Sequence, residues 1–267
     1  MSHRFVIRYI RFSFLLALML RGWSVVIRWL NNWICKNLWI CLVVILAPTV
    51  VKSASLNAID PFALYPKNIV FKVLRNDVVI GKHQVFFSRL KNDDVGVVVR
   101  LNLQINFLSF PIYKFDYKSN AVWHNMKLKS LLAEQNDNGE KIVVKVSRQN
   151  NILKIINQDS KFQTHGNTFP TNHWNPQVVL ADKVINTLTG EPSSVVIKNL
   201  GKEKIMAQDE AIFATKYKYT GDINALVWYS DRGNWVKMQF EGKDGVGIDY
   251  VCVECGLEYE IKEDVKH

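Results

Sequence analysis

Two cysteines near the end of the chain, Cys252 and Cys255, have a C-x-x-C spacing that is found in redox couples, zinc sites and local disulfides. A zinc site usually takes four ligands from two such pairs, and the sequence offers no second pair. A thioredoxin-like redox motif opens a helix after a strand, whereas only twelve residues follow Cys255. The sequence therefore favours a local disulfide, with unpaired or intermolecular thiols as the second interpretation and a metal site as the third.

The disulfide interpretation sets a geometric condition on the backbone. Residues three apart on a continuing strand point to opposite faces and stand about 10 Å apart, beyond the roughly 7 Å that a disulfide allows between Cα atoms. Cys252 and Cys255 can therefore pair only where the strand ends in a turn, which Gly256 permits.

A second group with possible chemistry consists of His165, His173 and Asp182, around a predicted junction between strands and a helix. Two imidazoles and a carboxylate could bind a metal or act as acid and base. Seven residues separate the two histidines, a gap that matches no common metal-site spacing, and histidines in a solvated loop are the simpler interpretation. Motifs of the H-E-x-x-H, G-x-S-x-G, P-loop and glycine-rich nucleotide types are absent from the sequence. We expect no cofactor and no metal, with catalysis by this group as the alternative.

Aromatic residues on predicted strands form a third candidate set. Trp123, Trp174, Trp228 and Tyr217 could wall an apolar pocket for an acyl chain or form a stacking surface for sugars. Aromatic residues are also favoured in strands, where they fill the core beneath a sheet. The core interpretation is the simpler one for each residue, and some of the four could serve both roles.

The elements that must position these residues are mostly strands. Apolar and polar residues alternate over residues 97–107, and the same pattern recurs over residues 113–117, 142–146 and 213–219. A period of two indicates strands with one wet face. Short turn sequences such as Asn138-Gly139 between adjacent runs predict antiparallel hairpins, because parallel neighbours need long crossovers.

One stretch, residues 175–190, predicts a helix of about three turns. Asn175 is a capping residue, Pro176 suits the first helical position, and a glycine ends the stretch. It separates residues 66–158 from residues 193–253, each of which predicts an antiparallel meander. We expect a mainly β fold, either a single large curved antiparallel sheet or an open barrel, with the short helix across its concave side.

The front of the chain, residues 1–55, is a basic and apolar leader that predicts a hydrophobic helical segment. The chain carries a net charge of +10, and this segment holds seven Lys or Arg and no Asp or Glu, so the remainder carries only +3. In that remainder both signs of charge are interspersed, which gives no reason to expect nucleic-acid binding. Residues 38–51 are an uncharged apolar run followed by small residues, as in a secretory signal.

Two interpretations of the leader stay open. Its basic residues form either a signal region lengthened by a wrong start, with translation beginning at Met19, or an interfacial helix that anchors the chain to a membrane. Both place the body outside the cytoplasm, in the periplasm or cell envelope. We assign residues 1–55 to the signal or anchor, 56–66 to a linker, 67–258 to the β domain and 259–267 to a charged tail.

Several short segments resemble those of one family. They are Ile80-Gly81, Asn138-Gly139, "FPTNHWNP", "INTLTGE" and "YKYTGDINALVWYSDRGNWVKMQFEGKDG". Over roughly residues 66–253 the chain resembles exported proteobacterial proteins grouped as domain of unknown function 6134, which is similar to the 3108 group. The shared motifs are turns and core aromatics, so the resemblance implies no catalytic residue. It implies a curved-sheet envelope protein, and some such proteins hold lipid in their concavity.

Taken together, these features predict an exported envelope protein without catalytic activity. Its curved sheet would bind an apolar, lipid-like ligand or an envelope protein partner. The first alternative is an envelope hydrolase or metal-dependent enzyme that uses His165, His173 and Asp182. The second alternative is a purely structural, scaffolding role.

Overall fold

A computed structural model describes residues 59–158 and 160–257. The chain divides into two compact units, Met1–Leu56 and Asn57–His267, and all described residues belong to the second. The predicted leader and the charged tail lie outside the described residues.

The described part of the chain folds almost entirely into strands. The first elements in chain order are α2 (Pro61–Leu64), β1 (Ile69–Arg75), β2 (Val78–Arg89), the 3₁₀-helix η1 (Lys91–Asp93), β3 (Val95–Phe107), β4 (Phe110–His124), β5 (Lys127–Asp137), β6 (Glu140–Gln149), β7 (Ile152–Asn157), β8 (Ser160–His165) and β9 (Phe169–Pro170). They are followed by the 3₁₀-helix η2 (Pro176–Leu180), β10 (Lys183–Ile185), β11 (Pro192–Ala207), β12 (Glu210–Gly221), β13 (Ala225–Ser230), β14 (Trp235–Glu241) and β15 (Gly247–Glu254).

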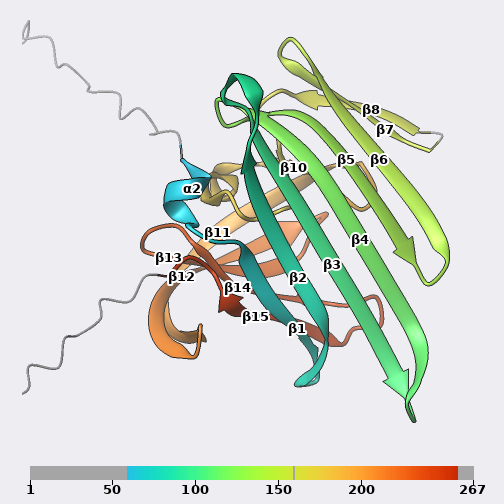
Figure 1. Cartoon of the computed structure of the whole chain (residues 1–267), viewed down its shortest axis with the longest axis vertical. Coiled ribbons are helices and arrows are strands. Elements are labelled where there is room, and N and C mark those ends of the chain that lie inside the picture. The colour runs from blue at the N-terminus through green and yellow to red at the C-terminus, as the bar shows by residue number, and fades with distance from the viewer. Residues whose placement is uncertain (1–58, 159, 258–267) are drawn as a thin grey trace, which may run out of the picture. The chain divides into compact units, whose positions relative to one another are not determined.

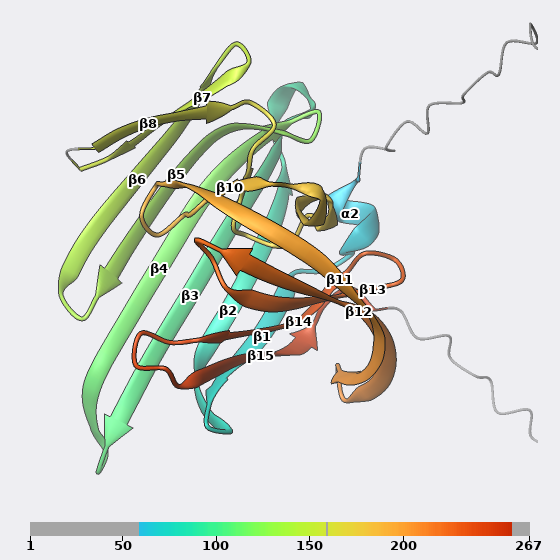
Figure 2. The same cartoon turned by 180° about the vertical axis from the view of Figure 1, so that it is seen from behind.

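All the strands belong to one 15-stranded sheet in the order β8-β7-β6-β5-β4-β3-β2-β1-β15-β14-β13-β12-β11-β10-β9. Neighbours pair antiparallel, except for the short parallel pair β9–β10. The two predicted meanders are thus present, and β1 joins them by pairing with β15. Figures 1 and 2 show β2–β6 as one curved layer, crossed by a second layer made of β11–β15. The prediction of one large curved antiparallel sheet is confirmed.

Alternation along the strands decides which side chains enter the core between the two layers. On β3, the side chains of Val97 and Val99 are fully buried, whereas Arg100 on the other face is exposed. Farther along the same apolar face, Leu103 is half-buried and Phe107 is 64% exposed. The apolar face of β3 therefore extends past the end of the core, and the β3–β4 hairpin projects beyond it (Figure 1).

The predicted linker contains structure of its own. Asp60 caps the one-turn helix α2 by accepting a hydrogen bond from the backbone N–H of Phe62. The Tyr65 hydroxyl, 1% exposed as a residue, donates to the carbonyl oxygen of Trp174 and accepts from the backbone N–H of Trp235, both at 2.9 Å. These bonds attach the segment to the loop before η2 and to strand β14, so it is part of the folded body.

The predicted three-turn helix at residues 175–190 is wrong in length. Its beginning agrees with the sequence, because Asn175 accepts a hydrogen bond from the N–H of Gln177 and Pro176 follows it. However, the segment forms only the 3₁₀-helix η2 and then strand β10, which pairs with both β9 and β11. Val184 and Ile185 become fully buried in this strand. The hydrogen bonds to β9 and β11, together with this burial, stabilise a strand more than the local sequence pattern stabilises a helix.

Candidate functional site

Cys252 and Cys255 lie where the last strand ends. Strand β15 stops at Glu254, and Gly256 has a φ of +69° in the turn that follows. The turn brings the two Cα atoms to 6.1 Å, and the sulfurs form a disulfide. The backbone N–H of Cys255 also donates to Oε1 of Gln208 at 2.7 Å, which ties this turn to the β11–β12 hairpin.

His165, His173 and Asp182 are not brought together. His165 is exposed on edge strand β8, where its Nε2 lies 2.9 Å from Nδ2 of Asn151. Asp182 is also exposed, whereas His173 is 5% exposed and packs against aromatic rings of the core. No hydrogen bond or ion pair found for residues 59–158 and 160–257 joins any two of the three. The same described residues contain no group of three or more metal-ligating side chains.

All three predicted ligand-binding tryptophans are buried core residues, and two of them pack against each other. Trp123 and Trp174 are 2% and 1% exposed, and their rings meet edge to face at 5.3 Å. Trp174 also contacts Phe87, so the pair fills the space between strands β2 and β4 and the loop before η2.

Trp228 points to the opposite face of its sheet. It pairs in register with Lys216 and Lys237, and both ammonium groups lie 5.0 Å from its ring. Its indole Nε1 donates to Oε1 of Glu203 at 2.7 Å. These charged side chains cover the ring of Trp228, so that the residue is only 1% exposed and offers no surface to a ligand.

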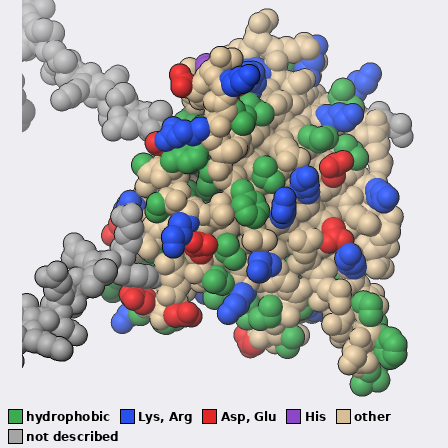
Figure 3. Space-filling view, in the orientation of Figure 1, with side chains coloured by type: hydrophobic (Ala, Val, Ile, Leu, Met, Phe, Trp, Pro, Cys, Tyr) green, Lys and Arg blue, Asp and Glu red, His purple; other side chains and the backbone are tan. Residues whose placement is uncertain are grey.

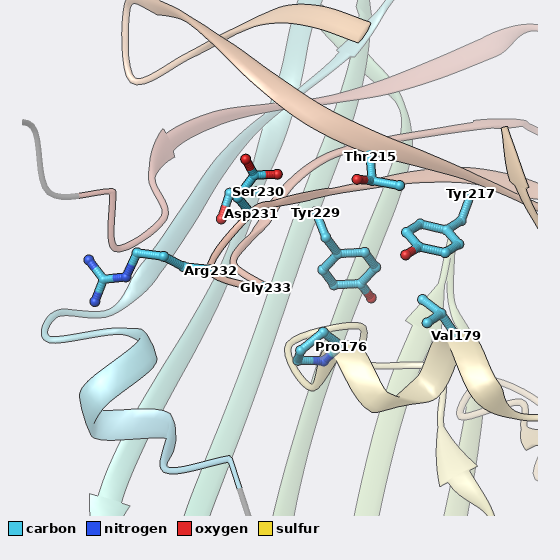
Figure 4. A pocket seen from close by; sticks show the side chains of 9 residues that line it. All are labelled: Pro176, Val179, Thr215, Tyr217, Tyr229, Ser230, Asp231, Arg232 and Gly233. Carbon is cyan, nitrogen blue, oxygen red and sulfur yellow. The ribbon is translucent and has the colours of Figure 1, made fainter. Parts of the chain in front are cut away.

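Tyr217, the fourth predicted residue, does line a pocket, which we call the tyrosine pocket. It is an open cavity of about 280 Å³ lined by Pro176, Val179, Thr215, Tyr217, Tyr229, Ser230, Asp231, Arg232 and Gly233. Figure 4 shows the rings of Tyr217 and Tyr229 facing Pro176 and Val179 of η2. The two rings meet edge to face at 6.0 Å. Strands β12 and β13 thus form one wall of the pocket and η2 forms the other.

Hydrogen bonds hold the walls of the tyrosine pocket in place. The Tyr229 hydroxyl donates to the carbonyl oxygen of His173 at 2.9 Å, and burial raises the pKa of Tyr229 well above its ordinary value, so its ring stays neutral. At the mouth, Asp231 forms an ion pair with Lys202 at 2.6 Å, and Ser230 Oγ donates to Oδ1 of Asn234 at 2.9 Å. The hydroxyl of Ser230 is hydrogen-bonded to the amide of Asn234, and the lining residues include no histidine or cysteine. The arrangement is suited to binding.

The sequence pointed to aromatic residues of the strands as pocket walls, but not to the turn or to η2. Tyr217 was recognisable as an aromatic on the dry face of a strand, but Ser230–Gly233 has only the pattern of a turn. Pro176 and Val179 were assigned to a longer helix. The convergence of these segments depends on how β12–β13 packs against η2, and no local pattern in the sequence reports that packing.

Two histidines occupy the core beside the pocket wall. His83 on β2 contacts Trp235 and Tyr250 at ring distances of 5.3 Å, and His173 contacts Trp235 at 5.6 Å. Burial lowers the pKa of His83 to about 3, with a further contribution from His173, and burial lowers the pKa of His173 to about 4. Within the described chain, both ring nitrogens of His83 and Nδ1 of His173 lack hydrogen-bond partners. Both imidazoles are therefore neutral at pH 7.

The helices of the described segments are all short. None of them is long and apolar enough to cross a membrane.

Comparison with known proteins identifies a family and a fold. The family described as Domain of unknown function (DUF6134) matches residues 71–253, which confirms that family as the one the sequence resembles. Among solved structures, the chain is similar to the crystal structure of a beta-barrel-like protein of domain of unknown function DUF1849 from Brucella abortus, with 8% identity and a TM-score of 0.52. This similarity covers 72% of the present chain and 97% of that chain, and it concerns the fold alone. No curated protein matches the sequence.

Proposed function

This chain belongs to the DUF6134 family, and we propose that it is an exported, non-catalytic binding protein that holds the apolar part of an amphipathic ligand in the tyrosine pocket. The observation that carries the proposal is the pocket itself, in which two tyrosine rings face Pro176 and Val179 (Figure 4). The lining is mixed, with rings and aliphatic side chains in one part and polar or charged side chains in the rest, which suits a ligand that has both an apolar and a polar part.

The volume of the pocket limits the size of its ligand. About 280 Å³ holds roughly nine or ten non-hydrogen atoms, taking about 30 Å³ for each as in liquid water. That is enough for a short acyl segment or a single ring, and too little for a complete two-chain lipid. The ligand would therefore place only its apolar end between the rings.

The mouth of the pocket suits a polar headgroup. Asp231 and Lys202 form an ion pair there, with side chains that are 64% and 56% exposed. Exposed pairs of this kind contribute little to stability, so either partner can rearrange to contact a ligand at small cost. Ser230 adds a hydroxyl beside them.

Export to the periplasm or cell envelope is part of the proposal. It is supported by the basic and apolar leader of residues 1–55 and by the disulfide between Cys252 and Cys255, because disulfides persist in oxidising compartments. After export, the leader would either be cleaved as a signal or be retained as a membrane anchor.

Binding is tested with decanoate as a probe, by isothermal titration of the protein and of paired tryptophan variants. Val179→Trp places an indole inside the pocket and is expected to abolish binding. Leu180→Trp makes the same change one residue later, at a side chain that is 71% exposed and outside the pocket, and should bind decanoate normally. Tyr217→Ala removes one wall and should weaken binding about tenfold, the equivalent of about 1.4 kcal/mol. Equal affinities in the two tryptophan variants would exclude the tyrosine pocket as the site.

A further inference from the structure

The tip of the β3–β4 hairpin exposes four large apolar side chains. Phe107, Leu108, Phe110 and Ile112 are 64%, 78%, 73% and 59% exposed. Hydrophobic side chains gather at the lower right end of the molecule in Figure 3, where Figure 1 places this hairpin. We call residues 107–112 the apolar tip.

The apolar tip differs from the turns of the other hairpins in composition. The β1–β2, β5–β6, β11–β12 and β14–β15 connections contain Asp77, Asn138-Gly139, Asp209 and Asp244-Gly245 respectively. Such polar residues are the usual choice for solvated turns. The apolar tip instead turns through Leu108 and Ser109, between two phenylalanines.

The backbone of the apolar tip adopts a conformation that leucine disfavours. Leu108 and Ser109 have φ values of +46° and +71°, where a two-residue hairpin normally uses Asn-Gly. Leu108 gains no burial in exchange for this conformation, because its side chain is 78% exposed. A strained residue without packing is a reason to look for a function outside the folded core.

The distribution of charge sets how far the apolar tip could enter an apolar medium. Between Arg100 and Lys114 the hairpin carries no charged residue. Lys114 lies five or six residues from the turn, or roughly 15–20 Å along a strand at about 3.3 Å per residue. It forms an ion pair with Asp116 at 3.0 Å, so the first charges met are already paired. An amphipathic element typically enters a bilayer by about 5–10 Å, which this uncharged length exceeds.

Two features favour lipid over a protein surface as the occupant. The backbone groups that face each other inside the end of the hairpin are paired, with Phe107 opposite Phe110, and those on its outer edges can bond to water in the interfacial region. The tip is also a narrow projection, and its four side chains offer on the order of 500 Å², less than the roughly 800 Å² per partner of a stable protein interface. We propose that the apolar tip inserts into the interfacial region of a lipid bilayer and holds that end of the sheet against the membrane.

The test reads the environment of the apolar tip directly, in the full-length chain. Ser109→Cys is labelled with the fluorophore NBD after Cys35 and Cys41 are replaced by serine, while Cys252 and Cys255 stay in their disulfide. Vesicles of phosphatidylethanolamine and phosphatidylglycerol should raise the emission severalfold, shift it to shorter wavelength, and make it sensitive to a quencher at shallow lipid depth. A label at Asp209→Cys, on the β11–β12 turn, serves as the control and should stay in water. Both labelled variants carry the same leader, so attachment by the leader alone cannot produce a difference in emission between residue 109 and residue 209.

A second variant separates insertion from misfolding. Phe107→Ser with Phe110→Ser should abolish the emission change at residue 109 and leave the thermal midpoint unchanged, because both side chains lie outside the core. The proposal is overturned if the label at residue 109 stays in water when vesicles are present, or if it responds no more than the label at residue 209. It is also overturned if native mass spectrometry shows a dimer that the double serine variant dissociates, since a second copy of the chain would then cover the apolar tip.

Discussion

At the scale of single residues, burial decides what the candidate side chains can do. His165 and Asp182 are exposed and separate, whereas His173 and His83 lie among aromatic rings that hold them neutral. A neutral imidazole in this environment packs against the neighbouring rings, and protonating it costs free energy because the charge would be buried. The sequence could show where the histidines stand along the chain, but their protonation depends on neighbours from distant strands such as Trp235.

The buried histidines predict an acid-sensitive fold. The pKa of each is near 6.5 when unfolded and falls to about 3 for His83 and about 4 for His173 in the folded chain. Above pH 6.5 each histidine is neutral in both the folded and the unfolded chain, so its titration does not change the free energy of unfolding. As the pH falls below 6.5, only the unfolded chain takes up protons, so each histidine lowers the free energy of unfolding by up to about 1.4 kcal/mol per pH unit, until its folded pKa is reached.

His83→Phe keeps a ring against Trp235 and Tyr250 and removes one titrating group. The slope of the free energy of unfolding against pH, measured by urea denaturation between pH 7 and pH 4.5, gives the number of protons taken up on unfolding. This number should be about one lower in His83→Phe than in the parent chain. The control Gln163→Phe, at an exposed position of β8, adds a ring without removing a titrating group and should leave the slope as it is in the parent chain. An unaltered slope in His83→Phe would mean that His83 is already protonated or solvated in the folded state.

At the scale of elements, period-two patterns predict strands well because a strand needs only one buried face. The alternation at residues 97–107 lies within β3, and the pattern at residues 213–219 lies within β12. The helix predicted at residues 175–190 failed where pairing competed with local propensity. Asn175 and Pro176 do start a turn of helix, yet Lys183–Ile185 gains more as a strand between β9 and β11. The tyrosine pocket could not be predicted, because its walls come from segments that meet only in the folded sheet.

The disulfide at the end of β15 gives a prediction for this element. It closes a loop of only four residues, for which chain entropy corresponds to about 2 kcal/mol. Cys252→Ala with Cys255→Ala should lower the free energy of unfolding by about that amount in urea, and alanine avoids a buried hydroxyl at two positions that are 3% and 0% exposed. Chemical reduction of the parent chain should cause the same loss. Rapid alkylation of both cysteines in the untreated protein would contradict the pairing.

At the scale of the whole molecule, the sheet is continuous because β1 pairs with β2 on one side and with β15 on the other. The neighbours within each meander follow from chain order and short turns, so the sequence predicts them. The β1–β15 pairing joins the first and last strands of the described chain, which are far apart in the sequence, so no local sequence pattern indicates it. Its consequence is a shared core, in which Phe71 of β1 contacts Trp235 and Tyr250 of the C-terminal meander.

Phe71 therefore tests whether the two meanders unfold together. Its ring is fully buried and lies 4.4 Å from that of Trp235, so Phe71→Ala should cost about 3–5 kcal/mol. Because the sheet is continuous, far-UV circular dichroism and tryptophan fluorescence should report one coincident transition at lower denaturant in this variant. Phe213→Ala, at a side chain that is 65% exposed, removes the same ring and should shift the free energy of unfolding by less than about 0.5 kcal/mol. Two separated transitions in Phe71→Ala would show that each meander is stable alone and that the β1–β15 junction couples them only weakly.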